Sequence, residues 1–256
     1  MPVLALAKLV IKEIFRKKDF YVALVLMAAV LLYVSSLKVY NVENVVRYLQ
    51  EAGLALIYLV STLLAVPLAA RQYPSEVQQR TLAVAMAKPV RRFEFILGKF
   101  LGACAAGVSC FLIFYALFAL LAFSKDPQLS WPAVAQTAAL FCFGLTVAAA
   151  MASAFSYYMT FSAAVSVTLV LYLLMNAYGA GLKQFGAGLG PAGGRAVTLV
   201  YYLLPHFEFF DLRQRLIHGW GPVPMWLVAA LGGYALLYTA LLLLLAWARF
   251  RRQAIR

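Results

Sequence analysis

Residues able to carry out catalysis or to bind a metal are few in this sequence, and their spacing suits neither task. The two histidines, His206 and His218, stand near Glu208 and Asp211 but would not be neighbours on one helix, so a metal site is not favoured. The chain has no Gly-x-Ser-x-Gly and no His-Glu-x-x-His motif. All three cysteines lie in apolar stretches without a Cys-x-x-Cys spacing, which favours buried thiols over a disulfide or a zinc site: Cys104, Cys110 and Cys142. The sequence therefore predicts a protein without catalytic residues and without a bound metal.

Charged residues of more interest gather in the segment 71–97, between two apolar stretches. The sequence Pro-Ser-Glu at 74–76 is typical of a helix start, and 77–87 can continue as a helix until the following Lys-Pro pair ends it. Glu76 and Arg80 would then offer opposite charges one helical turn apart. Two interpretations remain open on these grounds: a plain connection between two spans, or a rigid peg that a cytoplasmic partner binds.

The elements that must position these residues are membrane helices. Hydrophobic residues make up 65% of the 256 positions and charged residues 12%, whereas a soluble domain has about a quarter charged residues. A hydrocarbon core of about 30 Å needs about 20 apolar residues of helix. The uncharged stretch 127–182 is too long for one crossing, so it is expected to turn back at the polar cluster within 153–160. The sequence predicts an all-α integral membrane protein, one transmembrane domain with six spans at about 20–37, 53–70, 98–123, 131–155, 161–181 and 225–248.

The 22 lysines and arginines are distributed unevenly between the loops of these spans, and the net charge of +13 gathers on one side. Positively charged loops remain in the cytoplasm, so both termini and the 71–97 loop are predicted to be cytoplasmic in a multi-pass protein of the plasma or inner cell membrane. The basic residues on this side are Lys8, Lys12, Arg16, Lys17, Lys18, Arg71, Arg80, Lys88, Arg91, Arg92, Lys99, Arg249, Arg251, Arg252 and Arg256.

Residues 1–19 are patterned as an amphipathic helix. One face would carry Leu4, Ala7 and Ile11, and the adjoining row would carry Lys8 and Lys12. A cleaved signal peptide is the alternative, but the region before the first apolar run is long and patterned, which is unusual for one. We expect a helix in the headgroup plane of the inner leaflet.

The segment 182–224, between the last two spans, is too long for a plain turn. Its apolar part of about 14 residues is too short to cross a bilayer of about 30 Å. We expect a re-entrant or interfacial helical segment on the outer side. A pair between Asp211 and Arg215, one turn apart, would stabilise its polar end.

Three short motifs follow one another along the chain. The longest has a Glu, then Arg-Thr-Leu, Lys-Pro-Val-x-Arg, an aromatic residue and Gly-Lys-Phe, at Glu76, Arg80, Thr81, Leu82, Lys88, Pro89, Val90, Arg92, Phe95, Gly98, Lys99 and Phe100. The second is Leu-Pro-x-x-Glu-x-Phe within 201–212, and the third surrounds Leu6, Lys12, Glu13, Arg16 and Lys17. In this order, with six spans, the chain resembles the permease subunits of type-2 ATP-binding-cassette exporters over its whole length.

The resemblance implies a homodimer or heterodimer of permeases in the lipid bilayer, with separate cytoplasmic ATPase subunits and no nucleic acid. It places a coupling helix in the 71–97 loop, where the ATPase would bind near Glu76, Arg80, Thr81, Leu82, Lys88, Pro89, Arg91 and Arg92. The chain lacks the phosphate-binding motif Gly-x-x-x-x-Gly-Lys-Ser/Thr. No cofactor is therefore expected on this chain, and ATP and Mg²⁺ would be bound by the partner.

Polar residues within the expected spans are candidates for a substrate path. Hydroxyl groups in membrane helices more often bond their own backbone or a neighbouring helix, whereas the resemblance implies a path between protomers along spans two and five. The candidates are Ser61, Thr62, Ser166, Thr168, Tyr172 and Asn176. An apolar path of this kind suits lipids or amphipathic compounds, and the glycines at 98, 102, 232 and 233 are expected to be sites of close helix packing. The competing hypothesis is an ATPase-independent secondary carrier or a membrane assembly or scaffold protein, although charged or broken midplane segments typical of carriers are missing from the expected spans.

Overall fold

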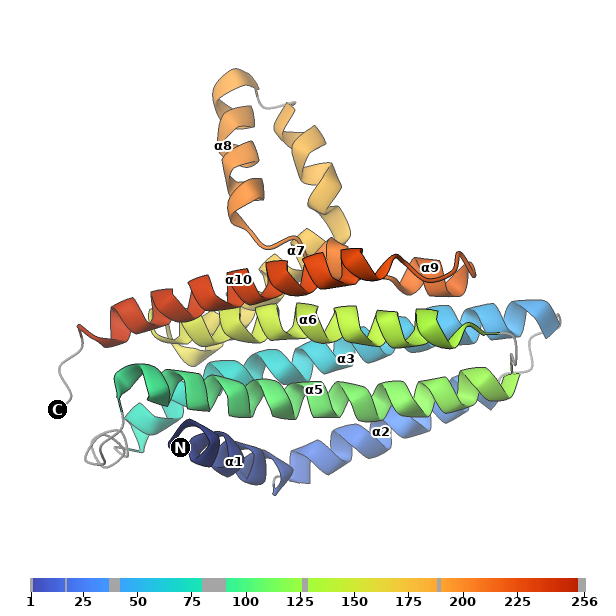
Figure 1. Ribbon diagram of the computed structural model, residues 1–256, viewed down its shortest axis with the longest axis horizontal. Coiled ribbons are helices and arrows are strands. Elements are labelled where there is room, and N and C mark those ends of the chain that lie inside the picture. Colours follow the sequence, from blue (N-terminus) through green and yellow to red (C-terminus); the bar gives the residue numbers. More distant parts are fainter. Residues whose placement is uncertain are drawn as a thin grey trace.

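The computed structural model describes residues 2–16, 18–36, 42–79, 91–125, 129–187 and 190–252. These residues form helices and their connections, and they contain no strand, which confirms the all-α class. In the labels of Figure 1 the helices are α1 (Pro2–Phe15), α2 (Lys18–Ser36), α3 (Val42–Gln78), α5 (Arg92–Lys125), α6 (Trp131–Ser156), α7 (Phe161–Ala187), α8 (Gly190–Leu203), the 3₁₀ helix η1 (Phe207–Phe210), α9 (Arg213–Ile217) and α10 (Met225–Phe250).

Four helices in the described part of the chain are long and apolar enough to cross a membrane: Gln50–Gln78 of α3, Arg92–Ser124 of α5, Trp131–Ser156 of α6 and Met225–Phe250 of α10. They coincide with the second, third, fourth and sixth expected spans. The expected turn within 153–160 is also present, because α6 ends at Ser156 and α7 begins at Phe161. Helices α2 and α7 occupy the two remaining expected spans, but the number of six spans stays a prediction.

The long helices lie side by side, with α6 between α10 and α3 and with α5 alongside α3 (Figure 1). We call one end of this bundle the basic end, where α3 and α10 finish and α5 and α7 begin. The opposite end, where α6 and α10 begin, is the far end. Helix α8 and the last part of α7 stand away from the bundle (Figure 1).

Helix α1 packs lengthwise against the start of α5 through two glycines. A Cβ atom at Gly98 would lie 2.8 Å from the Leu6 Cβ, and one at Gly102 would lie 2.6 Å from the Val10 Cβ. Only glycine permits this approach, so the expected close packing at these positions is present. Ala7 and Val10 are buried in this contact, whereas Leu4 is 55% exposed. The position of α1 at the membrane surface stays a prediction.

The expected helix start at Pro74 is wrong, because Pro74 lies inside α3, which continues to Gln78. A proline removes one backbone donor but does not end a long helix when neighbouring groups compensate. Pro74 leaves the Ala70 carbonyl without its usual donor, and α3 nevertheless continues for four more residues. Next to the proline, Gln72 Nε2 donates to the Leu68 carbonyl and Ser75 Oγ donates to the Gln72 carbonyl, both at 3.1 Å. With 37 residues, α3 is about 55 Å long at 1.5 Å per residue, much longer than a bilayer core.

Candidate functional site

The coupling loop predicted at 71–97 is described only at its two flanks. Arg80, Thr81, Leu82, Lys88 and Pro89 lie outside the described residues. Glu76 belongs to the last turn of α3, Arg91 directly precedes α5, and Arg92 begins it. The described part of the coupling site is therefore limited to its two flanks, residues 71–79 and 91–97.

The flanks are joined by an ion pair that connects two helices. Lys99 Nζ lies 2.5 Å from Glu76 Oε1, and the two side chains are only 6% and 16% exposed. Glu76 therefore has a partner from α5, which the sequence did not predict. The expected pair of Glu76 with Arg80 stays a prediction, because Arg80 lies outside the described residues. A shielded pair of this kind holds its helices in one register, since removing either charge leaves the other poorly solvated.

Arg92 connects the same flank to the end of α10. Its Nη1 donates to the carbonyls of Phe250 at 3.1 Å and Arg251 at 2.7 Å, and its guanidinium lies 5.7 Å from the centre of the Phe250 ring. A cation on the last carbonyls of a helix is favourable because these groups lack intrahelical donors. Arg91 differs: its side chain is exposed, while its backbone N–H donates to Glu94 Oε2 at 2.9 Å.

Four aromatic rings fill the space behind these charges, and we call them the aromatic cluster: Tyr73, Phe95, Tyr157 and Phe250. Tyr73 stacks on Tyr157 at 4.2 Å, and Phe250 lies 5.7–5.9 Å from each of the other three. Burial raises the pKa of Tyr157 well above its usual value, and nearby Tyr73 adds to this, so the phenol stays neutral. The cluster packs α3, α5, the α6–α7 turn and α10 into one unit at the basic end.

The six candidate path residues divide into two groups. Ser61, Thr62, Thr168 and Tyr172 are buried, and they belong to α3 and α7, which pack against each other. Thr62 Oγ1 donates to the Tyr58 carbonyl at 2.8 Å, whereas the Ser61 and Thr168 hydroxyls lack a hydrogen-bond partner. Ser166 is exposed on the other face of α7, and Asn176 is half-buried.

The ion pair between Arg213 and Asp211 lies against this contact between α3 and α7. The sequence predicted a different partner for Asp211. Arg213 Nη2 approaches Asp211 Oδ2 at 2.5 Å, and the guanidinium lies 5.1 Å from the centre of the Tyr58 ring. The expected partner of Asp211, Arg215, is therefore the wrong one. Burial lowers the pKa of Arg213, but the hydrogen bonds and charge of Asp211 outweigh this, and the pKa is raised overall.

Sequence reasoning also missed Gln136, which ties the loop before α10 to α6. Gln136 Nε2 donates to the Val223 carbonyl at 2.9 Å, and Gln136 Oε1 accepts from the Val223 N–H at 2.8 Å. Both residues are buried, so the two bonds satisfy groups that have no access to water. A glutamine within an otherwise apolar expected span was the available sign of such a contact.

No group of three or more His, Cys, Asp or Glu residues close enough to hold a metal occurs in the ranges that the structure describes. His206 is buried and contacts Tyr234, whose hydroxyl lies 3.0 Å from the His206 backbone nitrogen and 3.1 Å from Nδ1.

The two neighbouring glycines of α10, Gly232 and Gly233, differ in how closely other residues approach them. A Cβ at Gly232 would lie 3.2 Å from the Phe143 ring, but Gly233 has open space and is not the close-packing site that the sequence suggested.

The sequence of the chain matches the model of a known protein family over residues 4–255, and that family is described as ABC-2 family transporter protein. No curated protein gives a significant match. The family match extends from α1, through the two flanks joined by Glu76 and Lys99, to the residues that follow α10. Since it covers nearly the whole chain, and since the helices described above include four that are long and apolar enough to cross a membrane, the chain belongs to the ABC-2 family of membrane transport proteins.

Proposed function

We propose that this chain is the permease half of an ATP-driven exporter, that it forms a substrate path as a dimer, and that separate cytoplasmic ATPase subunits drive it through the 71–97 loop. Membership of the ABC-2 family supports a permease component that works with an ATPase. ATP and Mg²⁺ belong to the ATPase, and both termini of the permease face the cytoplasm of the plasma or inner membrane. The family match is the reason to prefer a permease over an ATPase-independent carrier or scaffold protein.

The observation that carries the proposal is the way in which both flanks of the loop are fixed to the bundle. Glu76 and Lys99 join α3 to α5, and Arg92 joins α5 to the end of α10. A displacement of the loop by a partner would therefore move three long helices together, because packed helices shift as rigid bodies. A loop attached only at its ends to independent helices would absorb the same displacement.

The substrate path is proposed to follow the face of α7 that carries Ser166. This residue is exposed, and so are its apolar neighbours on α7, Val170 at 55% and Leu173 at 50%. A lipid or an amphipathic substrate suits such a surface, which a second permease copy would enclose. Asn176, half-buried on the same helix, would contribute the polar contact.

Two measurements test the proposal. First, a tagged permease is purified from its native membrane: a stoichiometric ATPase chain is expected, and its absence would favour the carrier or scaffold. Second, Arg80→Glu should release the ATPase or uncouple its turnover from transport, whereas Asn176→Leu should change transport or dimer stability and leave ATPase binding intact. An intact complex with unchanged ATP turnover in Arg80→Glu would remove Arg80 from the coupling contact.

The orientation is tested separately with single cysteines at exposed positions. Cysteine at Arg252, after α10, should be protected from a membrane-impermeant maleimide in intact cells, and cysteine at Trp220 at the far end should be labelled. The reverse labelling would invert the proposed topology, while leaving the contacts of the basic end unchanged.

A further inference from the structure

The four tryptophans of the chain all lie near the two ends of the bundle. Trp131, Trp220 and Trp226 are at the far end and 62–71% exposed, and Trp247 lies in the last turn of α10. Tryptophan is enriched at both membrane–water interfaces. With 26 residues, α6 is about 39 Å long, so its two ends would reach the interfaces on either side of a hydrocarbon core of about 30 Å. Positions along α6 therefore indicate depth in the bilayer.

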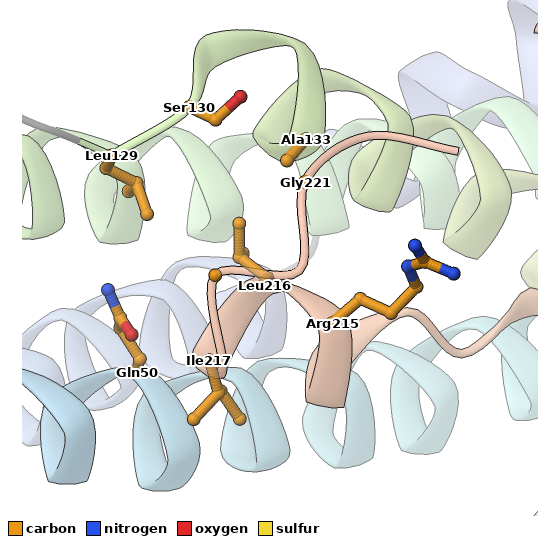
Figure 2. Close-up of a pocket in the computed structure, with 9 residues that line it drawn as sticks. Gln50, Leu129, Ser130, Ala133, Arg215, Leu216, Ile217 and Gly221 are labelled. Carbon is orange, nitrogen blue, oxygen red and sulfur yellow. The ribbon is translucent and has the colours of Figure 1, made fainter. Parts of the chain in front are cut away.

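The segment that joins α8 to α10 reaches the middle of α6. A Cβ at Gly144, half-way along α6, would lie 3.2 Å from the Phe210 Cβ of η1. Phe210 is buried, and η1 contacts both α6 and α7. From there the chain continues through α9, which lies between α3 and α6 (Figure 2), to Trp220 at the far end. The segment therefore enters the bundle at about half its depth, although it belongs to none of the four long apolar helices.

The ion pair between Arg213 and Asp211 lies on this segment, below the start of α6. The Arg213 guanidinium lies 5.1 Å from the centre of the Tyr58 ring. This ring stacks on Phe141 at 3.6 Å, and its hydroxyl lies 3.5 Å from the Thr137 carbonyl oxygen. At 1.5 Å per residue, Thr137 and Phe141 are about 9 and 15 Å from the start of α6. A hydrocarbon core of about 30 Å, centred on α6, would begin about 5 Å from that start, so the pair would lie within it.

Asp211 occupies one edge of the Arg213 guanidinium completely. Nε of Arg213 donates to both carboxylate oxygens at 2.9 Å, and Nη2 donates to Oδ2 at 2.5 Å. The backbone N–H of Arg213 donates to Oδ1 at 3.0 Å. With the Tyr58 ring against it as well, the guanidinium is held in one orientation.

The other edge of the guanidinium, at Nη1, has no acceptor in the part of the chain that the structure describes. Nη1 makes no hydrogen bond there, and it is absent from the buried atoms that lack a partner, so it is accessible. The Arg213 side chain as a whole is 26% exposed. N–H groups that face hydrocarbon without an acceptor are unfavourable, and a charged residue at membrane depth typically marks a binding or transport site. The geometry therefore indicates an acceptor from outside the chain.

We propose that Nη1 of Arg213 binds the phosphate or carboxylate headgroup of an amphiphile within the membrane, while Asp211 and Tyr58 hold the guanidinium in place. The planar guanidinium fits the oxygens of both headgroups, and its orientation is set before the ligand arrives. Two sources share this chemistry: a resident membrane phospholipid and a transported amphiphile. Only the second source rests on the proposed function.

The test uses the full-length protein in dodecyl maltoside micelles, a detergent without phosphate or carboxylate groups. Native mass spectrometry measures the retention of dihexanoyl phosphatidic acid and of dihexanoylglycerol, which has the same acyl chains but lacks the phosphate. Saturable retention of the phosphatidic acid alone is expected. Equal retention of the two amphiphiles, or no saturable retention of either, would overturn the proposal.

A second measurement distinguishes the two sources. The permease is purified with its ATPase, loaded with dihexanoyl phosphatidic acid and supplied with ATP and Mg²⁺. Loss of the bound lipid that depends on ATP hydrolysis indicates a transported amphiphile, and its retention indicates a resident lipid. Because binding itself is measured on the permease alone, a missing ATPase would contradict the proposed function without changing the binding result.

Variants decide whether Arg213 is responsible. Arg213→Lys keeps a charge for Asp211 but lacks the second edge of donors, so it should weaken retention about tenfold, which corresponds to about 1.4 kcal/mol. The double variant Asp211→Asn/Arg213→Gln leaves no charge unpaired and should have the same effect, and it decides if Arg213→Lys fails to fold.

Arg215→Gln is the matched control, because it removes the same charge from the same short helix. Arg215 lines a small pocket of about 160 Å³ at the far end (Figure 2), where its Nη2 lies 3.5 Å from the Trp220 carbonyl oxygen. Retention should therefore be unchanged in this variant. Wild-type retention in Arg213→Lys, or an equal loss in Arg215→Gln, would overturn the proposal, since positive charge alone would then explain the binding.

Discussion

Lys99 donates a hydrogen bond to Glu76 Oε1 across 2.5 Å, which joins the last turn of α3 to the second turn of α5. Between the two residues in the sequence lies most of the 71–97 loop, where the sequence predicts the contact with an ATPase. The ion pair joins the two helices that flank the loop, so a force that a partner exerts on the loop acts on α3 and α5 together. Because both side chains are shielded from water, the pair is not weakened as exposed pairs are.

Replacing one member of this pair should destabilise the protein strongly. Glu76→Leu is expected to lower the free energy of unfolding by roughly 3 kcal/mol, because it leaves the shielded Lys99 ammonium without the carboxylate it contacts. The double variant Glu76→Leu/Lys99→Met should recover most of this loss, since the shielded ammonium is then removed as well. Unfolding midpoints in nanodiscs measure both effects, and an additive double variant would contradict the coupling of the two residues.

Arg91 and Arg92 should behave differently although they are adjacent and both were predicted to bind the ATPase. Arg92→Gln should expose the end of α10, since charge-assisted hydrogen bonds contribute about 1.5–3 kcal/mol. Faster amide hydrogen exchange around 247–252 would report this change. Arg91→Gln should leave this exchange unaltered, because its side chain is exposed, and should instead weaken ATPase binding. Similar exchange in the two variants would argue against the capping role of Arg92.

The packing of α1 depends on Gly102. Gly102→Val should displace α1 and cost about 1–3 kcal/mol, as overpacking does, because its Cβ would lie 2.6 Å from the Val10 Cβ and 2.9 Å from the Ala7 carbonyl oxygen. Protease cleavage within 2–16 should become faster. Gly233→Val is the control, since a Cβ at this helical glycine meets nothing within 4 Å. A stable, uncleaved Gly102→Val protein would show that the close contact is unimportant.

Gln136→Leu should release the loop that precedes α10. Two hydrogen bonds to Val223 are lost and the buried Val223 N–H is left without an acceptor, at a cost of about 1–3 kcal/mol. The measurement is hydrogen exchange at the Val223 amide, which should accelerate. Gln214→Leu, at an exposed position of α9, should leave this exchange unchanged.

The hydroxyls of Ser61 and Thr168 at the α3–α7 contact lack a hydrogen-bond partner. Replacing them distinguishes a role in helix packing from a role in transport. Thr168→Val and Ser61→Ala remove buried hydroxyls that have no partner, so stability should stay the same or rise by up to about 1 kcal/mol. Thr62→Val, which removes a bond of 2.8 Å to the Tyr58 carbonyl, should lower stability instead. If transport falls in Thr168→Val while its stability is retained, the hydroxyl serves the substrate path.

Much of the fold followed from patterns that act locally along the chain. The all-α class and the turn after Ser156 were predictable because apolar length and interrupted hydropathy reflect the thickness of the bilayer. The close packing at Gly98 and Gly102 was also predictable, since small residues one turn apart form a flat helix surface. Pro74 was misread as a helix start because the loss of one backbone hydrogen bond does not end a helix as long as α3, which packs against α5, α6 and α7.

The contacts of the candidate sites could not be predicted in this way. Asp211 pairs with Arg213 instead of Arg215, and Glu76 contacts Lys99 of another helix. Helical spacing predicts neighbours on one helix, but the partner of a charge is set by which other helix packs against it. The sequence by itself determined the membrane class, the uneven distribution of charge and the loop that is expected to couple to an ATPase. Only the tertiary structure decided which charges are paired and which, such as Arg215, remain available, because pairing depends on distances between elements far apart in the chain.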